Sequence, residues 1–109
     1  MESIAKQYFY AWNQHCSKDI GKLLADDIQF KDWNILVKGK KEFLDIINNI
    51  FIAYEDLNIK VLSIVPSYKT NKIICEIKMN FDNKETLFVV NIIKLNNDKK
   101  ISYIHAFRG

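Results

Sequence analysis

An asparagine in the middle of a predicted strand is the clearest chemical signal in this sequence. Asn91 interrupts a face on which every second residue is apolar, formed by Leu87, Val89, Ile93 and Leu95. Asparagine is disfavoured inside strands, and burying its amide has an energetic cost unless another group satisfies it. Asn91 therefore either bonds to a neighbouring backbone group or donates a hydrogen bond into a cavity.

Two other polar residues lie beside aromatic side chains. Asp32 lies between Phe30 and Trp33, and aspartates in such loops are mostly exposed. In an apolar pocket, loss of hydration would instead make Asp32 a stronger base and a candidate general base. Tyr8 shares the apolar face of the first predicted helix with Trp12. The commoner outcome for such a tyrosine is a ring packed in the core with its hydroxyl at the edge of the core.

The remaining candidates indicate neither a metal site nor a cofactor site. The two histidines, His15 and His105, are far apart in sequence, and no nearby carboxylates complete a ligand set. Cys16 and Cys75 lack the spacing of metal or redox motifs, so both are predicted to be small apolar residues. No glycine-rich phosphate loop occurs. We therefore expect no metal and no cofactor.

Length and charge exclude several classes of protein. A chain of 109 residues suits a single domain, residues 1–109. The net charge of +3 is too weak to suggest a nucleic-acid partner. The densest basic run, Lys38 to Lys41, is predicted to be a solvated loop and helix start, with an anion site as the alternative. Without a signal peptide or a long apolar run, we expect a soluble, cytoplasmic protein with no membrane partner.

The elements that must position these residues divide into helices and then strands. Apolar residues from Ile4 to His15 recur at helical spacing, with Ser3 as a candidate cap. Ser17 is predicted to cap a second helix that ends at Asp26-Asp27. A short strand at 28–30, a loop through Gly39 and a third helix at about 41–54 follow. The pattern then changes to period two, with strands at about 57–66, 72–81, 85–95 and 100–108.

Short polar turns separate these four strands, at 67–71, 82–84 and 96–98, and they predict antiparallel neighbours. Helices followed by a meander of strands indicate an α+β fold. The last two strands are apolar on both faces, and one layer of helices covers only one face. We therefore expect the outer face of the sheet to pack on a second copy, giving a homodimer.

Several segments together resemble the SnoaL-like, nuclear-transport-factor-2-like superfamily, which includes ketosteroid-isomerase-like proteins. They are Tyr8-Phe-Tyr-Ala-Trp-Asn13, Leu23-Leu-Ala-Asp-Asp-Ile28, Phe30-Lys-Asp32, the Gly39-Lys40 helix start and the closing Ile104-His-Ala-Phe-Arg-Gly109. The resemblance covers essentially the whole chain. It implies a cystatin-like cone, in which three N-terminal helices pack on a strongly curved, mainly antiparallel sheet around an apolar pocket. It does not imply one activity, because the fold hosts isomerases, cyclases, dehydratases and non-catalytic binding domains.

The resemblance also assigns roles to residues. Tyr8 matches the tyrosine that donates a hydrogen bond to an oxyanion in ketosteroid isomerases, and Asp32 matches their general base. Asn91 falls where that family has an aspartic acid that stays protonated at neutral pH and acts as second donor. An asparagine amide donates at any pH, usually more weakly. The implied reaction is abstraction of a proton next to a carbonyl, as in an isomerase, cyclase or dehydratase.

The C-terminal strand departs from the family. The resemblance places Ile104, Ala106 and Arg108 inward, whereas hydrophobicity alone favours the face of Tyr103 and Phe107. An inward Arg108 would replace an apolar pocket residue and could bind an anion through two hydrogen bonds. As a surface residue, it would have no such role.

The predicted ligand is therefore a small molecule, apolar or weakly acidic. Arg108, Trp12, Trp33 and Ile104 are the predicted ligand contacts. The alternatives to an enzyme are a ligand-binding module without turnover and a dimerisation domain without a ligand.

Overall fold

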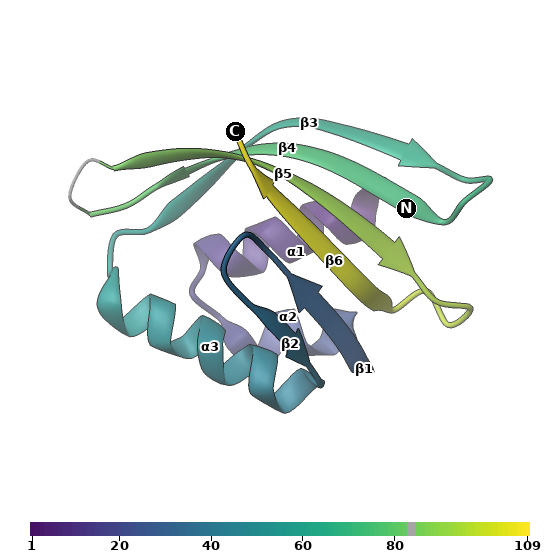
Figure 1. Cartoon of the computed structure of the whole chain (residues 1–109), viewed down its shortest axis with the longest axis horizontal. Helices are drawn as coiled ribbons and strands as arrows, with labels where there is room; N and C mark the ends of the chain where they lie inside the picture. Colours follow the sequence, from purple (N-terminus) through teal and green to yellow (C-terminus); the bar gives the residue numbers. More distant parts are fainter. Residues whose placement is uncertain (83–84) are drawn as a thin grey trace.

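The computed structural model describes residues 1–82 and 85–109, which form three helices and one six-stranded sheet (Figure 1). In chain order the elements are α1 (Glu2–Asn13), α2 (Ser17–Leu23), β1 (Leu24–Lys31), β2 (Leu36–Lys38), α3 (Lys40–Ala53), β3 (Asn58–Ser67), β4 (Lys72–Asn80), β5 (Thr86–Leu95) and β6 (Ile101–Arg108). The strand order is β2-β1-β6-β5-β4-β3. Every pair is antiparallel except β1 with β6, which is parallel. This arrangement confirms the predicted α+β fold.

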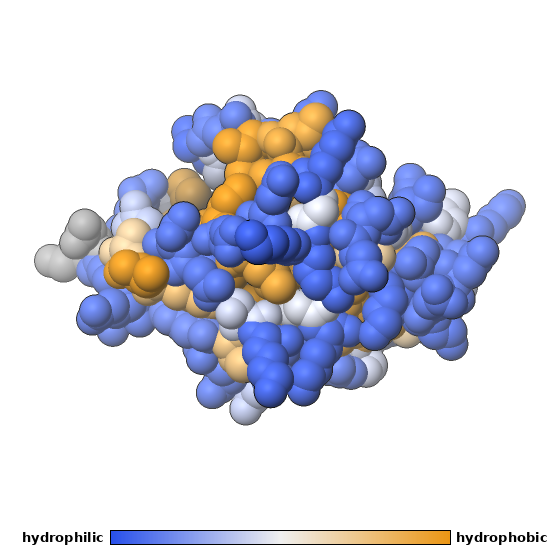
Figure 2. All heavy atoms as spheres, turned by 90° about the horizontal axis from the view of Figure 1, so that it is seen from below, coloured by the Kyte–Doolittle hydropathy of each residue, from blue (hydrophilic) through white to orange (hydrophobic). Residues whose placement is uncertain are grey.

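The sheet is strongly curved, and the helices lie on its concave side (Figure 1). α1 packs against β3, and α3 packs against β1 and α2. Side chains from α1 and from the inner sheet face therefore meet in one apolar interior. The face seen from below in Figure 2 is mainly hydrophilic, with hydrophobic residues in patches between charged ones. In the described part of the chain, no helix is long and apolar enough to span a membrane.

The alternation predicted for the long strands is confirmed. Ile73, Cys75 and Ile77 of β4 are buried on the inner face, and Asn91 of β5 is buried beside them. Ladder pairing aligns these side chains across the sheet, because Cys75 pairs with Asn91, and Asn91 pairs with Ala106 of β6. The predicted turn at 82–84 falls partly outside the described residues, since residues 83 and 84 are not described.

The second helix and the first strand have boundaries different from those predicted. α2 ends at Leu23 rather than at Asp26-Asp27, and β1 runs over Leu24–Lys31 rather than 28–30. Leu24 pairs with Ile101 of β6 and is fully buried. Pairing with a distant strand therefore overrides the helical preference of this segment. The predicted loop before Gly39 also contains β2, which pairs with the end of β1.

Neither predicted serine cap forms. Met1 and Cys16 occupy the N-cap positions of α1 and α2, and neither helix has a side-chain capping bond. Ser3 lies inside α1, where its hydroxyl accepts a hydrogen bond from Gln7 at 2.9 Å. Gly39 is the N-cap residue of α3 and has φ = 100°, a conformation that residues with a Cβ rarely adopt.

The inward face of β6 is the one implied by the family resemblance. Ile104 and Ala106 are buried, whereas Phe107 is 45% exposed. Ile101 is also fully buried, because the pairing of β5 with β6 shifts register between Lys94 and Leu95. A bulge of this kind turns neighbouring residues onto the same face. The sequence pattern alone therefore predicted the wrong phase for most of this strand.

Candidate active site

A cavity of about 260 Å³ lies between the helices and the inner face of the sheet. Its lining is mainly apolar and includes three residues predicted to do chemistry: Tyr8 from α1, Asp32 from the loop after β1, and Asn91 from β5. Among the described lining residues, Asp32 is the one acidic side chain, and none is a lysine or an arginine. The other lining residues are Phe9, Trp12, Phe30, Trp33, Ile35, Phe43, Ile46, Ile47, Ile50, Tyr54, Ile59, Ile77, Met79, Phe81, Leu87, Val89 and Ala106.

Tyr8 carries its phenol into the buried interior from α1. The residue is 3% exposed, and burial raises the pKa of its phenol well above the usual value of 10. The nearby Trp12 side chain opposes this rise in pKa, and the Cys75 thiol adds to it. The hydroxyl therefore stays protonated at neutral pH and can serve as a hydrogen-bond donor.

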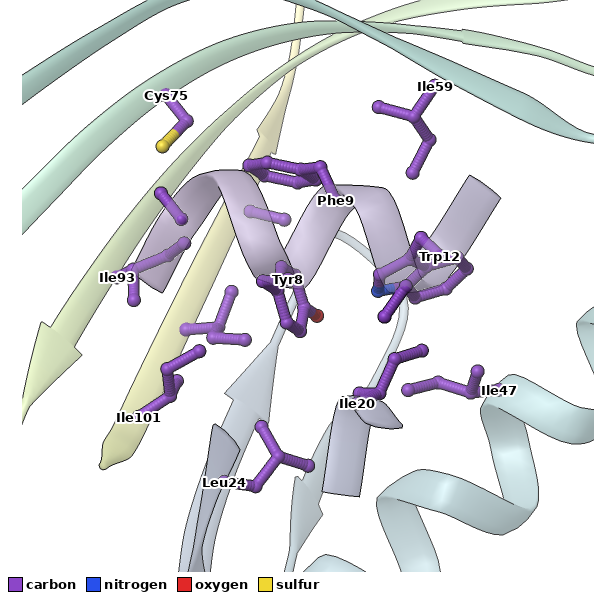
Figure 3. Close-up of a cluster of buried hydrophobic side chains, with 14 of the residues drawn as sticks. Tyr8, Phe9, Trp12, Ile20, Leu24, Ile47, Ile59, Cys75, Ile93 and Ile101 are labelled. Atoms are coloured by element: carbon purple, nitrogen blue, oxygen red, sulfur yellow. The ribbon is translucent and has the colours of Figure 1, made fainter. Parts of the chain in front are cut away.

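Trp12 lies one helical turn after Tyr8 on the same buried face of α1. The two rings meet edge-on, with centroids 6.4 Å apart and planes at 70°. Figure 3 shows the phenol oxygen of Tyr8 directed toward the indole nitrogen of Trp12. Despite this approach, the indole N–H is buried and has no hydrogen-bond partner among the described residues.

Asn91 is the buried polar side chain of the inner sheet face. It is 7% exposed and lines the cavity. Of the two alternatives predicted for it, a bond to a neighbouring backbone group is not among the side-chain hydrogen bonds found in the described residues. The amide is thus placed to donate toward whatever fills the cavity.

Asp32 lies at the mouth of the cavity and is half-buried. Its Oδ1 accepts hydrogen bonds from the backbone N–H groups of Asn34 at 2.7 Å and Ile35 at 2.9 Å. These two bonds hold the turn that leads into β2. One carboxylate oxygen therefore has a structural role, and Oδ2 is left to face other groups.

The four predicted ligand contacts occupy different places. Trp12 and Trp33 line the cavity. Ile104 is fully buried and is not among the described lining residues, whereas Ala106, on the same face of β6, is. Arg108 is exposed outside the lining, and its guanidinium lies 5.7 Å from the centre of the Trp33 ring. That separation allows a cation–π contact at the mouth of the cavity.

Sequence reasoning missed the contact that fixes α1 against the sheet. Asn13 donates from Nδ2 to the backbone carbonyl of Ile59 at 2.8 Å, and its Oδ1 accepts from the Ile59 N–H at 2.6 Å. This paired contact joins the end of α1 to β3 and so sets the position of Tyr8 and Trp12. His15 adds a bond from Nε2 to the carbonyl of Leu57 at 2.8 Å. The position of Asn13 at the end of a predicted helix was the available signal.

Cys75 gives the structure a measurable pH dependence. Burial raises the pKa of its thiol from 9.0 to about 12. A folded pKa above the unfolded one means that the folded state binds more protons between these values. We expect the free energy of unfolding to fall as pH rises from about 9 to about 12, by about 1.4 kcal/mol per pH unit for this one group.

Urea unfolding measured across this pH range tests the expectation. Cys75→Ala should flatten the slope, while Cys16→Ala, at a half-buried cysteine, should leave it unchanged. An equal slope in Cys75→Ala and in the unaltered protein would contradict the assignment to Cys75.

In the described part of the chain, no cluster of three or more histidine, cysteine, aspartate or glutamate side chains could hold a metal ion. The polar side chains that line the cavity include the phenol of Tyr8, the amide of Asn91 and the carboxylate of Asp32. A family model described as a SnoaL-like domain matches residues 5–104. The chain belongs to the SnoaL-like family. No curated protein matches this SnoaL-like chain significantly.

Solved structures confirm the fold of this SnoaL-like protein at low sequence identity. A nuclear transport factor 2-like protein from Cytophaga hutchinsonii is 13% identical, with a TM-score of 0.85 over 99% of this chain and 88% of that one. A candidate ketosteroid isomerase from Kribbella flavida is 16% identical, with a TM-score of 0.84 over 98% and 76%. SalBIII, an epoxide hydrolase/cyclase-like enzyme of pyran ring formation in salinomycin, is 12% identical, with a TM-score of 0.81 over 99% and 89%. At such identities the likeness establishes the fold alone.

Proposed function

We propose that this protein binds a small, uncharged and mainly apolar carbonyl compound and abstracts a proton next to the carbonyl. The observation that carries the proposal is that Tyr8, Asp32 and Asn91, from three separate elements, line one apolar cavity. Several structural neighbours are named as isomerases or cyclases, which supports this reaction class.

The chemistry of the cavity favours an uncharged ligand. No described lining residue carries a positive charge, and an anion buried in an apolar pocket would lack compensation. A dry cavity of about 150 Å³ is known to hold benzene, so a cavity of about 260 Å³ suits a ligand with two small rings. Arg108 lies too far toward the surface to be part of this lining, so we do not propose the weakly acidic ligand that an inward Arg108 would favour.

In the proposed reaction, the Asp32 carboxylate takes a proton from the carbon next to the carbonyl. The electrons of that C–H bond form a C=C bond, and the carbonyl π electrons move onto oxygen to give an enolate. Tyr8 and Asn91 donate hydrogen bonds to this oxygen, and each such donor contributes roughly 10²–10³ in rate. Return of the proton from Asp32 to the same or another carbon completes exchange or isomerisation.

Deuterium exchange tests the reaction without knowledge of the natural substrate. 1-Indanone is a two-ring ketone with acidic protons next to its carbonyl. We expect the protein to accelerate replacement of these protons by deuterium in D₂O, followed by proton NMR, above the rate with serum albumin at the same concentration. Exchange at the background rate with indanone bound would favour the alternative, a binding module without turnover.

We also propose that the outer face of the sheet forms a homodimer. Phe88, Phe107, Val65 and Ile74 are 54%, 45%, 53% and 39% exposed on that face. Val90 and Ile92 lie between them, paired in the ladder with Phe107 and Ile74. An apolar surface of this kind is typical of a contact between protein chains.

Both cysteines are free thiols, which supports a reducing compartment such as the cytoplasm.

Light scattering tests the dimer. We expect a mass of twice the 12.8 kDa of the chain for the unaltered protein, and a monomer for Phe88→Glu/Phe107→Glu, because paired carboxylates would be buried without partners. Tyr10→Glu, at a residue of α1 that is 66% exposed, is the matched control and should remain dimeric. A monomeric unaltered protein at micromolar concentration would exclude this interface.

A further inference from the structure

The buried indole N–H of Trp12 has no role in the function proposed above. Trp12 is 8% exposed, and its nitrogen is the buried side-chain polar atom without a hydrogen-bond partner in the described residues. Leaving such a donor unpaired costs about 1–3 kcal/mol, and native proteins rarely keep one without a reason. We therefore expect the N–H to gain a hydrogen-bond partner when the protein binds its ligand.

The surroundings of the N–H restrict that partner. The rings of Trp12 and Phe51 pack against each other in an edge-to-face arrangement, with centroids 5.3 Å apart and planes at 82°. The nitrogen is itself inaccessible to water, so a ligand in the cavity cannot reach it directly. The polar atom it faces is the phenol oxygen of Tyr8 (Figure 3).

We propose that Trp12 is a positioning residue that donates its indole N–H to the phenol oxygen of Tyr8 when Tyr8 donates its own proton to the carbonyl oxygen of a bound ligand. The inference rests on the function proposed above and adds to it a relay of two hydrogen bonds, from Trp12 to Tyr8 and from Tyr8 to the ligand. Trp12 and Tyr8 lie one turn apart on the same helix, so α1 alone fixes their relative position.

The relay has a physical consequence for Tyr8. A phenol whose oxygen accepts a hydrogen bond becomes a stronger donor, because hydrogen bonds in a chain polarise one another. The approach of the indole N–H to the phenol already opposes, as a hydrogen-bond donor does, the rise in pKa that burial causes at Tyr8. A small shift of the phenol on ligand binding would complete the bond and remove the unpaired donor.

Nitrogen NMR of the two indole groups tests the relay. The chain has two tryptophans, and Trp33→Phe assigns the Nε1–H signal of Trp12. We expect 1-indanone to move the Trp12 N–H proton downfield, as a new hydrogen bond does, while indane, its hydrocarbon counterpart, moves it much less. In Tyr8→Phe, indanone and indane should have the same effect on Trp12.

Each other result overturns a defined part of the proposal. Equal shifts with indanone and indane in the unaltered protein, with both compounds bound, would exclude the relay and leave the pocket standing. An indanone-specific shift that persists in Tyr8→Phe would show that the N–H reaches the ligand without Tyr8. If neither compound perturbs either tryptophan, the function proposed for this cavity fails together with the relay.

Trp12→Phe separates positioning from packing. The substitution removes the N–H and also leaves a gap in the packing. The gap lowers the binding affinity for both indanone and indane. Loss of the relay should lower the affinity for indanone by about threefold to tenfold more than the affinity for indane. An equal loss for the two compounds would mean that Trp12 only packs.

Discussion

Asp32→Asn is expected to slow deuterium exchange at the carbon next to the indanone carbonyl by about 10²–10⁴-fold. The amide has no basic oxygen that can take the proton, so the reaction loses its acceptor. The substitution is suited to the question because the Asn side-chain oxygen can still accept the two backbone bonds that Oδ1 now receives from Asn34 and Ile35. The turn before β2 should therefore keep its conformation.

The control is a second aspartate of equal charge away from the cavity. Asp26 on β1 has a fully exposed side chain, which pairs with Lys40 at 3.3 Å, and surface pairs of this kind contribute little. Asp26→Asn should leave the exchange rate unchanged, and indanone should bind both variants with the affinity of the unaltered protein. If the Asp32→Asn variant exchanges the indanone protons at the rate of the unaltered protein, Asp32 is not the base of the reaction.

Much of the site was predictable because it depends on local periodicity. The i, i+4 spacing of Tyr8 and Trp12 places both side chains on one helix face. The period of two in β5 likewise requires Asn91 to share the inner face with Val89 and Ile93. In these cases the nearest neighbours in sequence determine the direction of the side chain.

Depth inside the fold was not predictable, because it is set by distant partners. Ile104 and Ala106 share one face of β6, yet Ala106 lines the cavity and Ile104 lies in the core. The difference arises from β1, whose parallel pairing places Phe30 opposite Ile104. No local pattern indicates that pairing. Arg108 lies two residues after Ala106, at the end of β6, and is exposed. Its surface position likewise depends on where β6 leaves the sheet.

Ile104→Ala is expected to lower the free energy of unfolding by about 2–5 kcal/mol. Ile104 is fully buried between β1 and β5, where it pairs with Phe30 and Ile93. Removal of its side chain from a position enclosed on both sides leaves a cavity that the sheet cannot close. For a domain whose total stability is about 5–15 kcal/mol, this loss would be visible as a large fall in the midpoint of urea unfolding.

Two comparisons separate a core role from the ligand contact first predicted for Ile104. Ile52→Ala, at a residue of α3 that is 77% exposed, should change stability by less than about 0.5 kcal/mol. Ile104→Val should lower the free energy of unfolding by about 0.5–1.5 kcal/mol. It should leave the affinity for indanone unchanged, because Ile104 lies in the core behind the residues that line the cavity. If Ile104→Val instead weakens indanone binding while stability is retained, the cavity extends further toward β1 than the lining residues indicate.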